Sequence, residues 1–154
     1  MNKKHWGPII WKLIHCLTYK IKDEYFSGQL NFIISTIRNI CSSLPCPYCA
    51  AHAQSFLRKV NFENIKTKND LINLFLTFHN TVNKRLKKKT YNREECDKIY
   101  NNISFMEVIN DYHAYTTTKK SGTKAMLNSF YMNRTNNNFI NKISKQLYKY
   151  KNLN

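Results

Sequence analysis

The feature that most constrains the fold is the spacing of apolar residues, which recur at intervals of three and four along nearly the whole chain. This spacing places apolar side chains on one face of an α-helix, whereas a half-buried strand needs alternation at every second residue. No convincing alternation occurs in residues 1–103, and the chain has only three Gly and three Pro. The sequence therefore predicts an all-α protein whose amphipathic helices share one core.

Proline and glycine are expected to delimit the first three helices. Pro8 suits the first turn of a helix, because its missing N–H is not needed there. A second helix follows the break at Ser27–Gly28 and stops at Pro45, and a short third helix begins at Pro47. The short connections between these segments are typical of a helical bundle.

Side-chain caps delimit the next two helices. Asn69 or Asp70 can cap a fourth helix, since both residue types accept hydrogen bonds from a first turn. Asn92, with Glu95 three residues later, resembles a capping box for a short helix that ends near Ile103. We therefore expect a four-helix bundle with a short fifth helix.

The chain is expected to have two parts, a domain of residues 1–103 and a basic, Asn- and Lys-rich C-terminal extension of residues 104–154. Within the extension, Thr116–Gly122 and Asn136–Asn138 are polar breaks, and the apolar spacing after each predicts further helical segments. Three states remain open for the extension: packing on the bundle, binding a partner, or partial disorder.

The formal net charge is +16, from 25 Lys and Arg against nine Asp and Glu, which raises the question of nucleic-acid binding. The charges are spread along the chain, and only Lys87–Lys89 forms a cluster. Frequent Lys, Asn and Ile together are also typical of an A/T-rich genome. Charge alone therefore does not favour nucleic acid as the partner.

No apolar stretch approaches the length of a spanning helix, so we expect no membrane span. Lys12 and His15 interrupt the apolar N-terminal run, and no small-residue cleavage site follows. We expect an intracellular protein without a signal peptide. Cysteines in a reducing compartment usually serve redox chemistry or metal binding.

The most informative tetrapeptide is Cys46-Pro47-Tyr48-Cys49. Two residues between the cysteines allow a disulfide to close across one helical turn. Because Pro47 starts a helix, Cys46 lies just before its N-terminus, where free N–H groups and the helix dipole favour a thiolate. A thiolate both attacks disulfides and leaves from them, so this geometry suits electron exchange.

Three other interpretations of this pair were weighed. Cys46, Cys49, His52 and His79 could form a zinc site, although no second compact ligand pair exists. A thioredoxin-like or glutaredoxin-like site would need strands and a proline downstream of the motif, and the chain has neither. Two buried free thiols would be the chance outcome.

Two further motifs accompany the cysteines. The first is a WGxxxWxxxH pattern made by Trp6, Gly7, Trp11 and His15. The second is an HNxVNxxLxK pattern over residues 79–88. In this order and spacing, with the CPYC motif and His52 between them, they resemble the Erv/ALR family of flavin-dependent sulfhydryl oxidases over about residues 3–100. The details are most similar to small members from large cytoplasmic DNA viruses.

The resemblance implies a thiol oxidase that holds FAD inside the bundle and uses Cys46 and Cys49 as catalytic residues. Electrons would pass from a substrate dithiol through this disulfide to FAD and then to O2, which gives H2O2. No metal ligand is assigned. The residues expected to bind the cofactor are Trp6, Gly7, Trp11, His15, His52, His79, Asn80, Val82, Asn83, Leu86, Lys88 and Tyr91.

Charged residues at the end of the fourth helix add to this expectation. Lys84, Lys87 and Lys88 lie where cations could meet a pyrophosphate. Cys16 and Cys41 lie on apolar faces and are expected to be buried free thiols. Pairing of Cys96 through a disulfide is doubtful, because the N-terminal partner found in some family members is absent.

The resemblance also implies partners and a location. No second CxxC shuttle is present, so the chain is expected to oxidise a separate protein dithiol or small redox carrier directly. By resemblance to the family, we expect a homodimer. The resemblance to viral members also implies a role in a viral disulfide-forming pathway, in the host cytoplasm or the virion. The rival interpretation is a basic helical virion or nucleic-acid-binding protein with structural or zinc-binding cysteines.

Overall fold

The computed structural model describes residues 2–118 and 123–154, without the side chains of residues 123–129 and 131. Over these residues the chain forms α-helices and no strand, which confirms the all-α prediction. The helices are α1 (Lys3–Tyr19), α2 (Phe26–Ser42), α3 (Pro47–Arg58), α4 (Lys68–Arg85), α5 (Arg93–Tyr100), α6 (Phe105–Thr117) and α7 (Thr123–Ile143). Short 3₁₀ turns occur at Asp23–Tyr25, Phe62–Asn64 and Leu147–Lys149.

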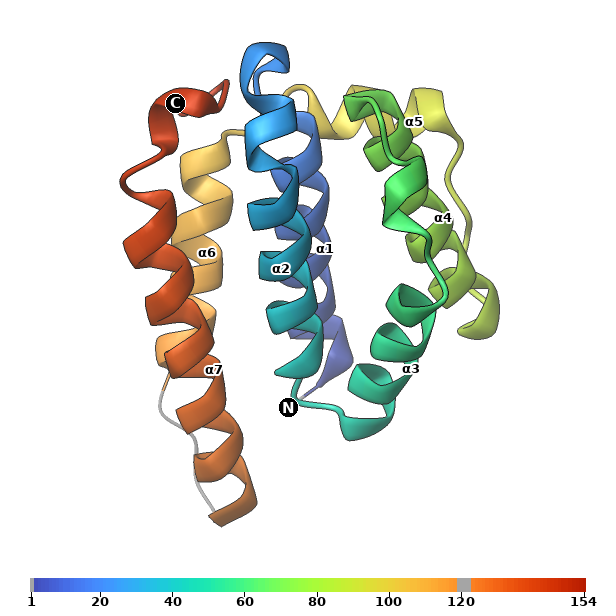
Figure 1. The fold of residues 1–154 in the computed structure, drawn as a ribbon. Coiled ribbons are helices and arrows are strands. Elements are labelled where there is room, and N and C mark those ends of the chain that lie inside the picture. The colour runs from blue at the N-terminus through green and yellow to red at the C-terminus, as the bar shows by residue number, and fades with distance from the viewer. Residues whose placement is uncertain (1, 119–122) are drawn as a thin grey trace.

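Helices α1 and α2 lie in the middle of the molecule (Figure 1). On one side α1 packs against α4, and α2 packs against α3, with α5 crossing the end of α4. On the other side α6 packs against α1 and α7 packs against α6 and α2. Helices α1 and α2 therefore contribute to two bundles. Their apolar residues must face α3 and α4 on one side and α6 and α7 on the other. Fully buried side chains of this shared core include Leu13, Leu17, Ile33, Ile37, Phe75 and Phe105.

The first two helices begin earlier than the sequence indicated. Asn2 caps α1 by accepting a hydrogen bond from the Lys4 N–H at 3.0 Å, so Pro8 lies inside the helix and not in its first turn. Likewise Ser27–Gly28 is part of the first turn of α2, because the preceding 3₁₀ turn leads directly into that helix. Both expected starts were wrong: the Asn2 cap starts α1 further upstream, and α2 follows its 3₁₀ turn without a side-chain cap.

The caps of α4 and α5 differ in how well they were predicted. Thr67 caps α4 and forms a capping box with Asp70 at the third helical position. The side chain of each residue accepts a hydrogen bond from the backbone N–H of the other. The expected cap at Asn69 or Asp70 was therefore wrong by two or three residues. The capping box of Asn92 and Glu95 is confirmed, although α5 ends at Tyr100.

The extension packs on the bundle. The sequence analysis did not delimit α6, and the break expected at Asn136–Asn138 lies inside α7. Asn136 is fully buried, and its Nδ2 lies 2.9 Å from Nδ1 of His113 on α6. This cross-helix hydrogen bond explains why a polar run continues a helix. Of the other expected break, Thr116 and Thr117 belong to α6, and residues 119–122 lie outside the described part.

The last residues of the chain are joined to two loops of the bundle by backbone hydrogen bonds. The Lys22 N–H donates to the Lys149 carbonyl at 2.9 Å, and the Lys151 N–H donates to the Lys20 carbonyl at 2.7 Å. The Phe105 N–H donates to the carbonyl of Asn152 at 2.8 Å. No helix in the described segments is long and apolar enough to cross a membrane.

A core substitution in α6 tests whether residues 104–154 unfold together with the bundle. Phe105→Ala removes a fully buried ring that lies 5.0 Å from the ring of Tyr150. We expect a loss of about 3–5 kcal/mol in the free energy of unfolding, within a single cooperative urea transition. Asn110→Ala, at an exposed position of α6, is the control and should change stability by about 0.7 kcal/mol or less. Two separate transitions would contradict the packing and favour an independent extension.

Candidate active site

A disulfide between Cys46 and Cys49 lies at the N-terminus of α3, with the two Cα atoms 5.1 Å apart. Pro47 is the first residue of the helix, as the sequence predicted, and Cys46 is its cap. The Cys49 N–H points at the Sγ of Cys46 at 3.2 Å. The positive end of the helix and this N–H both stabilise negative charge on Cys46, so its release as a thiolate from a mixed disulfide is favoured.

The two sulfurs face different surroundings. Cys46 is half-buried at the surface, and Cys49 is 8% exposed and lines a pocket of about 420 Å³. This asymmetry separates their chemistry. Cys46 is accessible to a protein thiol, whereas Cys49 is in contact with whatever the pocket contains.

Most of the residues expected to bind a cofactor line this pocket. They are Trp6, Gly7, Trp11, His52, His79, Val82, Asn83, Leu86, Lys88 and Tyr91. His15 and Asn80 do not line it, and both support residues that do. The structure thus brings together segments that are far apart in the sequence.

Trp11 and His79 form the aromatic wall of the pocket. Their rings are stacked with centroids 4.0 Å apart and planes 8° apart, and the edge of Phe78 meets Trp11 at 5.1 Å. Stacking of this kind joins α1 to α4 and fixes the orientation of both rings. The wall is flat and apolar, which suits a planar aromatic ligand.

His15 is fully buried behind this wall. Its Nε2 lies 2.9 Å from Nδ1 of His79, and its ring stacks on Tyr100 at 4.4 Å. Burial and the neighbouring His79 lower the pKa of His15 to about 3, and burial and Lys88 lower the pKa of His79 to about 4. Both rings are therefore neutral near pH 7. This hydrogen bond has two possible directions. When the Nε2–H of His15 donates to Nδ1 of His79, the buried and unpartnered Nδ1 of His15 carries no hydrogen. His79 then keeps its Nε2–H for a partner in the pocket.

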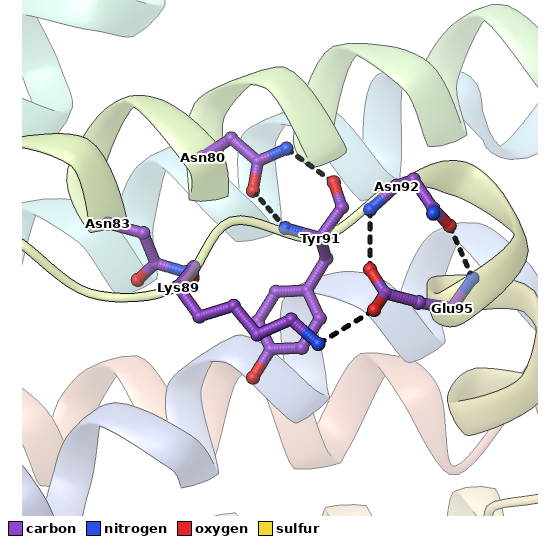
Figure 2. Close-up of polar contacts among 6 residues, drawn as sticks. All are labelled: Asn80, Asn83, Lys89, Tyr91, Asn92 and Glu95. Atoms are coloured by element: carbon purple, nitrogen blue, oxygen red, sulfur yellow. Dashed lines mark hydrogen bonds and ion pairs between the residues drawn. The ribbon is translucent and has the colours of Figure 1, made fainter.

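The two asparagines of the HNxVN motif fix the loop after α4 (Figure 2). The Asn80 amide donates to the Tyr91 carbonyl at 2.7 Å and accepts from the Tyr91 N–H at 2.9 Å. Asn83 donates to the carbonyl of Lys89 at 2.9 Å. These side-chain amides bond the backbone groups of the loop and so hold the loop against α4. Asn80 therefore acts on the pocket indirectly, by positioning Tyr91.

The same loop turns sharply at Lys87, which has a left-handed φ of 54°. The Lys88 N–H bonds to the Asn83 carbonyl at 2.8 Å and the Lys87 N–H to the Lys84 carbonyl at 3.1 Å, a Schellman pattern that ends α4. After this turn, Lys88 and Lys89 line the pocket, whereas Lys84 and Lys87 are exposed outside it. Of the three lysines considered for a pyrophosphate, only Lys88 is placed for that role.

The pocket is strongly basic. Its cations are Lys3, Lys4, Lys12, Arg85, Lys88 and Lys89, and no acidic residue lines it. Nε and Nη1 of Arg85 are buried without a hydrogen-bond partner. Such orphaned donors are costly unless an acceptor is supplied, so the lining fits a ligand that carries an anionic group.

Gly7 leaves room in the wall. A Cβ built on Gly7 meets no atom within 4 Å, although Gly7 lines the pocket on the first turns of α1. The backbone is therefore open to a ligand at this point. The aromatic wall, the basic lining and the gap at Gly7 together fit a large, flat, anionic cofactor.

Several pocket residues were missed by the sequence analysis, chiefly Arg85, Lys12, Lys89, Ile99 and Tyr100. Arg85 and Lys89 are close in sequence to the HNxVN motif, which was the available signal. Ile99 and Tyr100 come from α5, and no short motif marks them. Only the tertiary packing of α5 on α1 and α4 brings them to the pocket.

The three remaining cysteines are buried free thiols, as expected for Cys16 and Cys41, and Cys96 is also unpaired. Burial raises the pKa of Cys16 and of Cys41 to about 12, so neither forms a thiolate near pH 7. Cys41 lines the pocket but is inert as a nucleophile. Cys46 and Cys49 are therefore the cysteines best suited to thiol–disulfide exchange.

The structure does not favour the alternatives weighed for the cysteine pair. Over the described residues, no group of three or more His, Cys, Asp or Glu side chains could bind a metal ion. The same part of the chain lacks the strands that a thioredoxin-like site requires. The two cysteines are paired and not free.

Fold and site define a class of protein: a helical bundle with a redox disulfide at the edge of a cofactor-sized pocket. The family model described as Erv1 / Alr family matches residues 8–102. This chain belongs to that family. No solved structure matches the chain.

Curated relatives come from large DNA viruses. An African swine fever virus protein named FAD-linked sulfhydryl oxidase is 36% identical over 96 residues, which cover 62% of this chain and 80% of the relative. A variola virus protein named probable FAD-linked sulfhydryl oxidase OPG072 is 31% identical over 51% of this chain and 76% of the relative. A protein of invertebrate iridescent virus 3, named putative FAD-linked sulfhydryl oxidase 096R, is 28% identical over 57% of this chain and 60% of the relative.

The histidine pair predicts a loss of stability in acid. In the unfolded chain both imidazoles take up protons near pH 6.5, whereas in the folded chain their pKa values are about 3 and about 4. The pair's contribution to stability is therefore complete above about pH 6.5 and falls as the pH is lowered toward 4. We expect this to cost about 2 kcal/mol per imidazole between about pH 6.5 and 5.

The measurement is urea unfolding of the natural chain and of the double variant His15→Gln, His79→Gln across this range. The double variant should have the shallower pH dependence. Above about pH 7.5 the difference between the two chains should be constant, which serves as the control. Equal slopes in acid would contradict the placement of two neutral, buried imidazoles.

Proposed function

We propose that the chain is an FAD-linked sulfhydryl oxidase that forms disulfides in protein thiols, using O2 as the electron acceptor. The observation that carries the proposal is the position of the Cys46–Cys49 disulfide, with one sulfur at the surface and the other on the wall of a basic aromatic pocket. Membership of the Erv1/Alr family and the names of the viral relatives support it.

Two exchange steps use the asymmetry of the disulfide. A substrate thiolate attacks Sγ of Cys46, the Cys46–Cys49 bond breaks, and Cys49 leaves as a thiolate on the pocket wall. The second substrate thiol then attacks the mixed disulfide, and Cys46 leaves with its charge stabilised by the N-terminus of α3. The substrate has lost two electrons and two protons, and the cysteine pair is reduced.

A bound FAD would supply a two-electron acceptor for the reduced cysteines and a site at which O2 can be reduced to H2O2. We expect the Trp11–His79 wall to hold its planar ring and Arg85 and Lys88 to hold its pyrophosphate, whereas the ammonium of Lys89 is paired with Glu95 at 2.7 Å. His15 and Asn80 are positioning residues, because they act through His79 and Tyr91.

The substrate is proposed to be a separate protein dithiol or small redox carrier, because Cys46–Cys49 is the chain's sole CxxC pair. The viral relatives favour a role in disulfide formation in the host cytoplasm or the virion. The homodimer expected from family habit remains a prediction. Since α6 and α7 cover the outer face of α1 and α2, a second copy would have to bind elsewhere.

Removing the inner sulfur separates chemistry from cofactor binding. Cys49→Ser should eliminate thiol-dependent O2 consumption while FAD stays bound, because the pocket walls are unchanged and the serine cannot carry the electron pair. Cys96→Ala, which changes a buried thiol outside the pocket, should keep turnover and serves as the control. Retained turnover in Cys49→Ser would reject the assignment.

Gly7 offers a test of where the cofactor lies. Gly7→Ala should stabilise the free chain by about 0.4–1 kcal/mol, because the new methyl meets no protein atom and a helical glycine is replaced. The same methyl enters the pocket, so the affinity for FAD in a fluorescence titration should fall by about tenfold or more.

Gly28→Ala is the matched control, since its Cβ also meets nothing within 4 Å, and Gly28 lies on α2 outside the pocket. It should give a similar gain in stability with unchanged FAD affinity. If Gly7→Ala binds FAD as tightly as Gly28→Ala does, the cofactor does not occupy this part of the pocket.

A further inference from the structure

The acidic residues are distributed very unevenly along the chain. None of the nine occurs in residues 1–22, 25–62 or 71–93. These three segments supply every residue that lines the pocket except Ile99 and Tyr100. The disulfide and its surroundings are thus built from segments without a carboxylate side chain.

The fold converts this pattern into a polarised molecule. The N-termini of α1 and α3 and the C-terminus of α4 lie toward one end, the lower end in Figure 1. Four acidic residues come from the opposite ends of these helices: Asp23 and Glu24 after α1, Glu63 after α3 and Asp70 in the first turn of α4. The other five lie on α5 and α6. The disulfide end therefore presents uncompensated positive charge.

Two exposed cations near the disulfide do not line the pocket. Lys84 and Lys87 lie at the end of α4, where the neighbouring Arg85 reaches the ring of Tyr48 between the two cysteines. We call Lys84 and Lys87 the basic rim. In the described part of the chain, each ion pair involves Asp23, Glu94, Glu95 or Asp97, and none involves the rim.

An aromatic ring stands beside the rim. Tyr48, between the two cysteines, is 66% exposed, and the guanidinium of Arg85 lies 5.2 Å from its ring centroid. This contact supports the ring in a position next to the accessible sulfur of Cys46. An exposed aromatic ring that a cation supports is a typical anchor of a protein-binding surface.

We propose that the basic rim and Tyr48 dock an acidic segment of the dithiol substrate, in which Asp or Glu residues flank the reacting cysteines. The inference rests on the proposed oxidase function and specifies its substrate class. Charge complementarity would increase the rate of encounter and orient the substrate thiol toward Cys46. The exchange itself is unchanged: the substrate gains a disulfide, the Cys46–Cys49 pair is reduced, and O2 is the final oxidant.

The chemistry favours an acidic protein over nucleic acid as the occupant. The rim lies on the same end of the molecule as the disulfide, and a disulfide exchanges with a thiol. An acidic dithiol segment brings the thiol and the negative charge on one chain, whereas a nucleic acid brings only the charge. Nucleic-acid binding is therefore an outcome that the experiment must be able to detect.

The test compares two peptides with the same Cys-x-x-Cys core, one flanked by Glu and one by Lys, using the full chain loaded with FAD. For each peptide, kcat/KM for O2 consumption is divided by the rate constant with which the same peptide reduces a small uncharged disulfide. This ratio corrects for the different intrinsic reactivity of the two peptides' thiols. We expect the Glu-flanked peptide to be preferred by about tenfold or more at low salt. The preference should decrease as ionic strength rises, because salt screens exposed charges.

Charge reversal locates the effect. The double variant Lys84→Glu, Lys87→Glu should lose the preference and keep its turnover of dithiothreitol, which carries no charge at neutral pH. The matched control is Lys142→Glu, Lys145→Glu, which makes the same charge change at exposed positions at and beyond the end of α7 and should keep the preference.

The outcomes distinguish this inference from the function on which it rests. Turnover of dithiothreitol with equal corrected rates on the two peptides would overturn the docking proposal and leave the oxidase function standing. Tight binding of a DNA duplex at physiological salt without a peptide preference would overturn it in favour of nucleic acid. Failure to oxidise dithiothreitol at all would reject the proposed function itself.

Discussion

The contact between α1 and α4 is the constraint on which the site depends. Trp11 stacks on His79, and His15 bonds His79 from behind, so one imidazole is fixed on both sides by residues of the neighbouring helix. This contact joins α1 to α4 at the wall of the pocket. The reduced pKa values of the two imidazoles follow from the same burial and keep the wall uncharged.

A second constraint is the placement of the disulfide at a helix start. Pro47 begins α3 directly after Cys46, and the first turn of the helix then carries Cys49 to the pocket wall. One turn of helix thus separates an outer from an inner sulfur. The other thiols are buried with raised pKa values, which prevents them from competing for electrons.

Some features specified by local sequence were predicted well, although the starts of α1, α2 and α4 were not. The helical class, the start of α3 at Pro47 and the capping box of Asn92 and Glu95 depend on neighbours within a few residues, and all are present. Most motif residues line one pocket, with His15 and Asn80 behind it; helical spacing places the members of each motif on one face, and the packing of the helices brings the motifs together.

Features that depend on distant contacts were missed. Asn136 looked like a helix break, yet its bond to His113 keeps it in α7. Lys88 and Lys89 reach the pocket only because the turn at Lys87 reverses the chain, and Tyr100 only because α5 crosses the bundle. The path of residues 104–154 likewise depends on packing against α1 and α2, which no local pattern encodes.

The central claim is that the Cys46–Cys49 pair exchanges electrons with a flavin held in the pocket beside Cys49. The most direct measurement is the visible absorption spectrum of the purified full chain, first without air and with added dithiothreitol, then after air is admitted. The account predicts a yellow protein whose flavin band is bleached by the dithiol and returns with release of H2O2. A colourless chain, or a flavin band that the dithiol leaves unchanged, would contradict it.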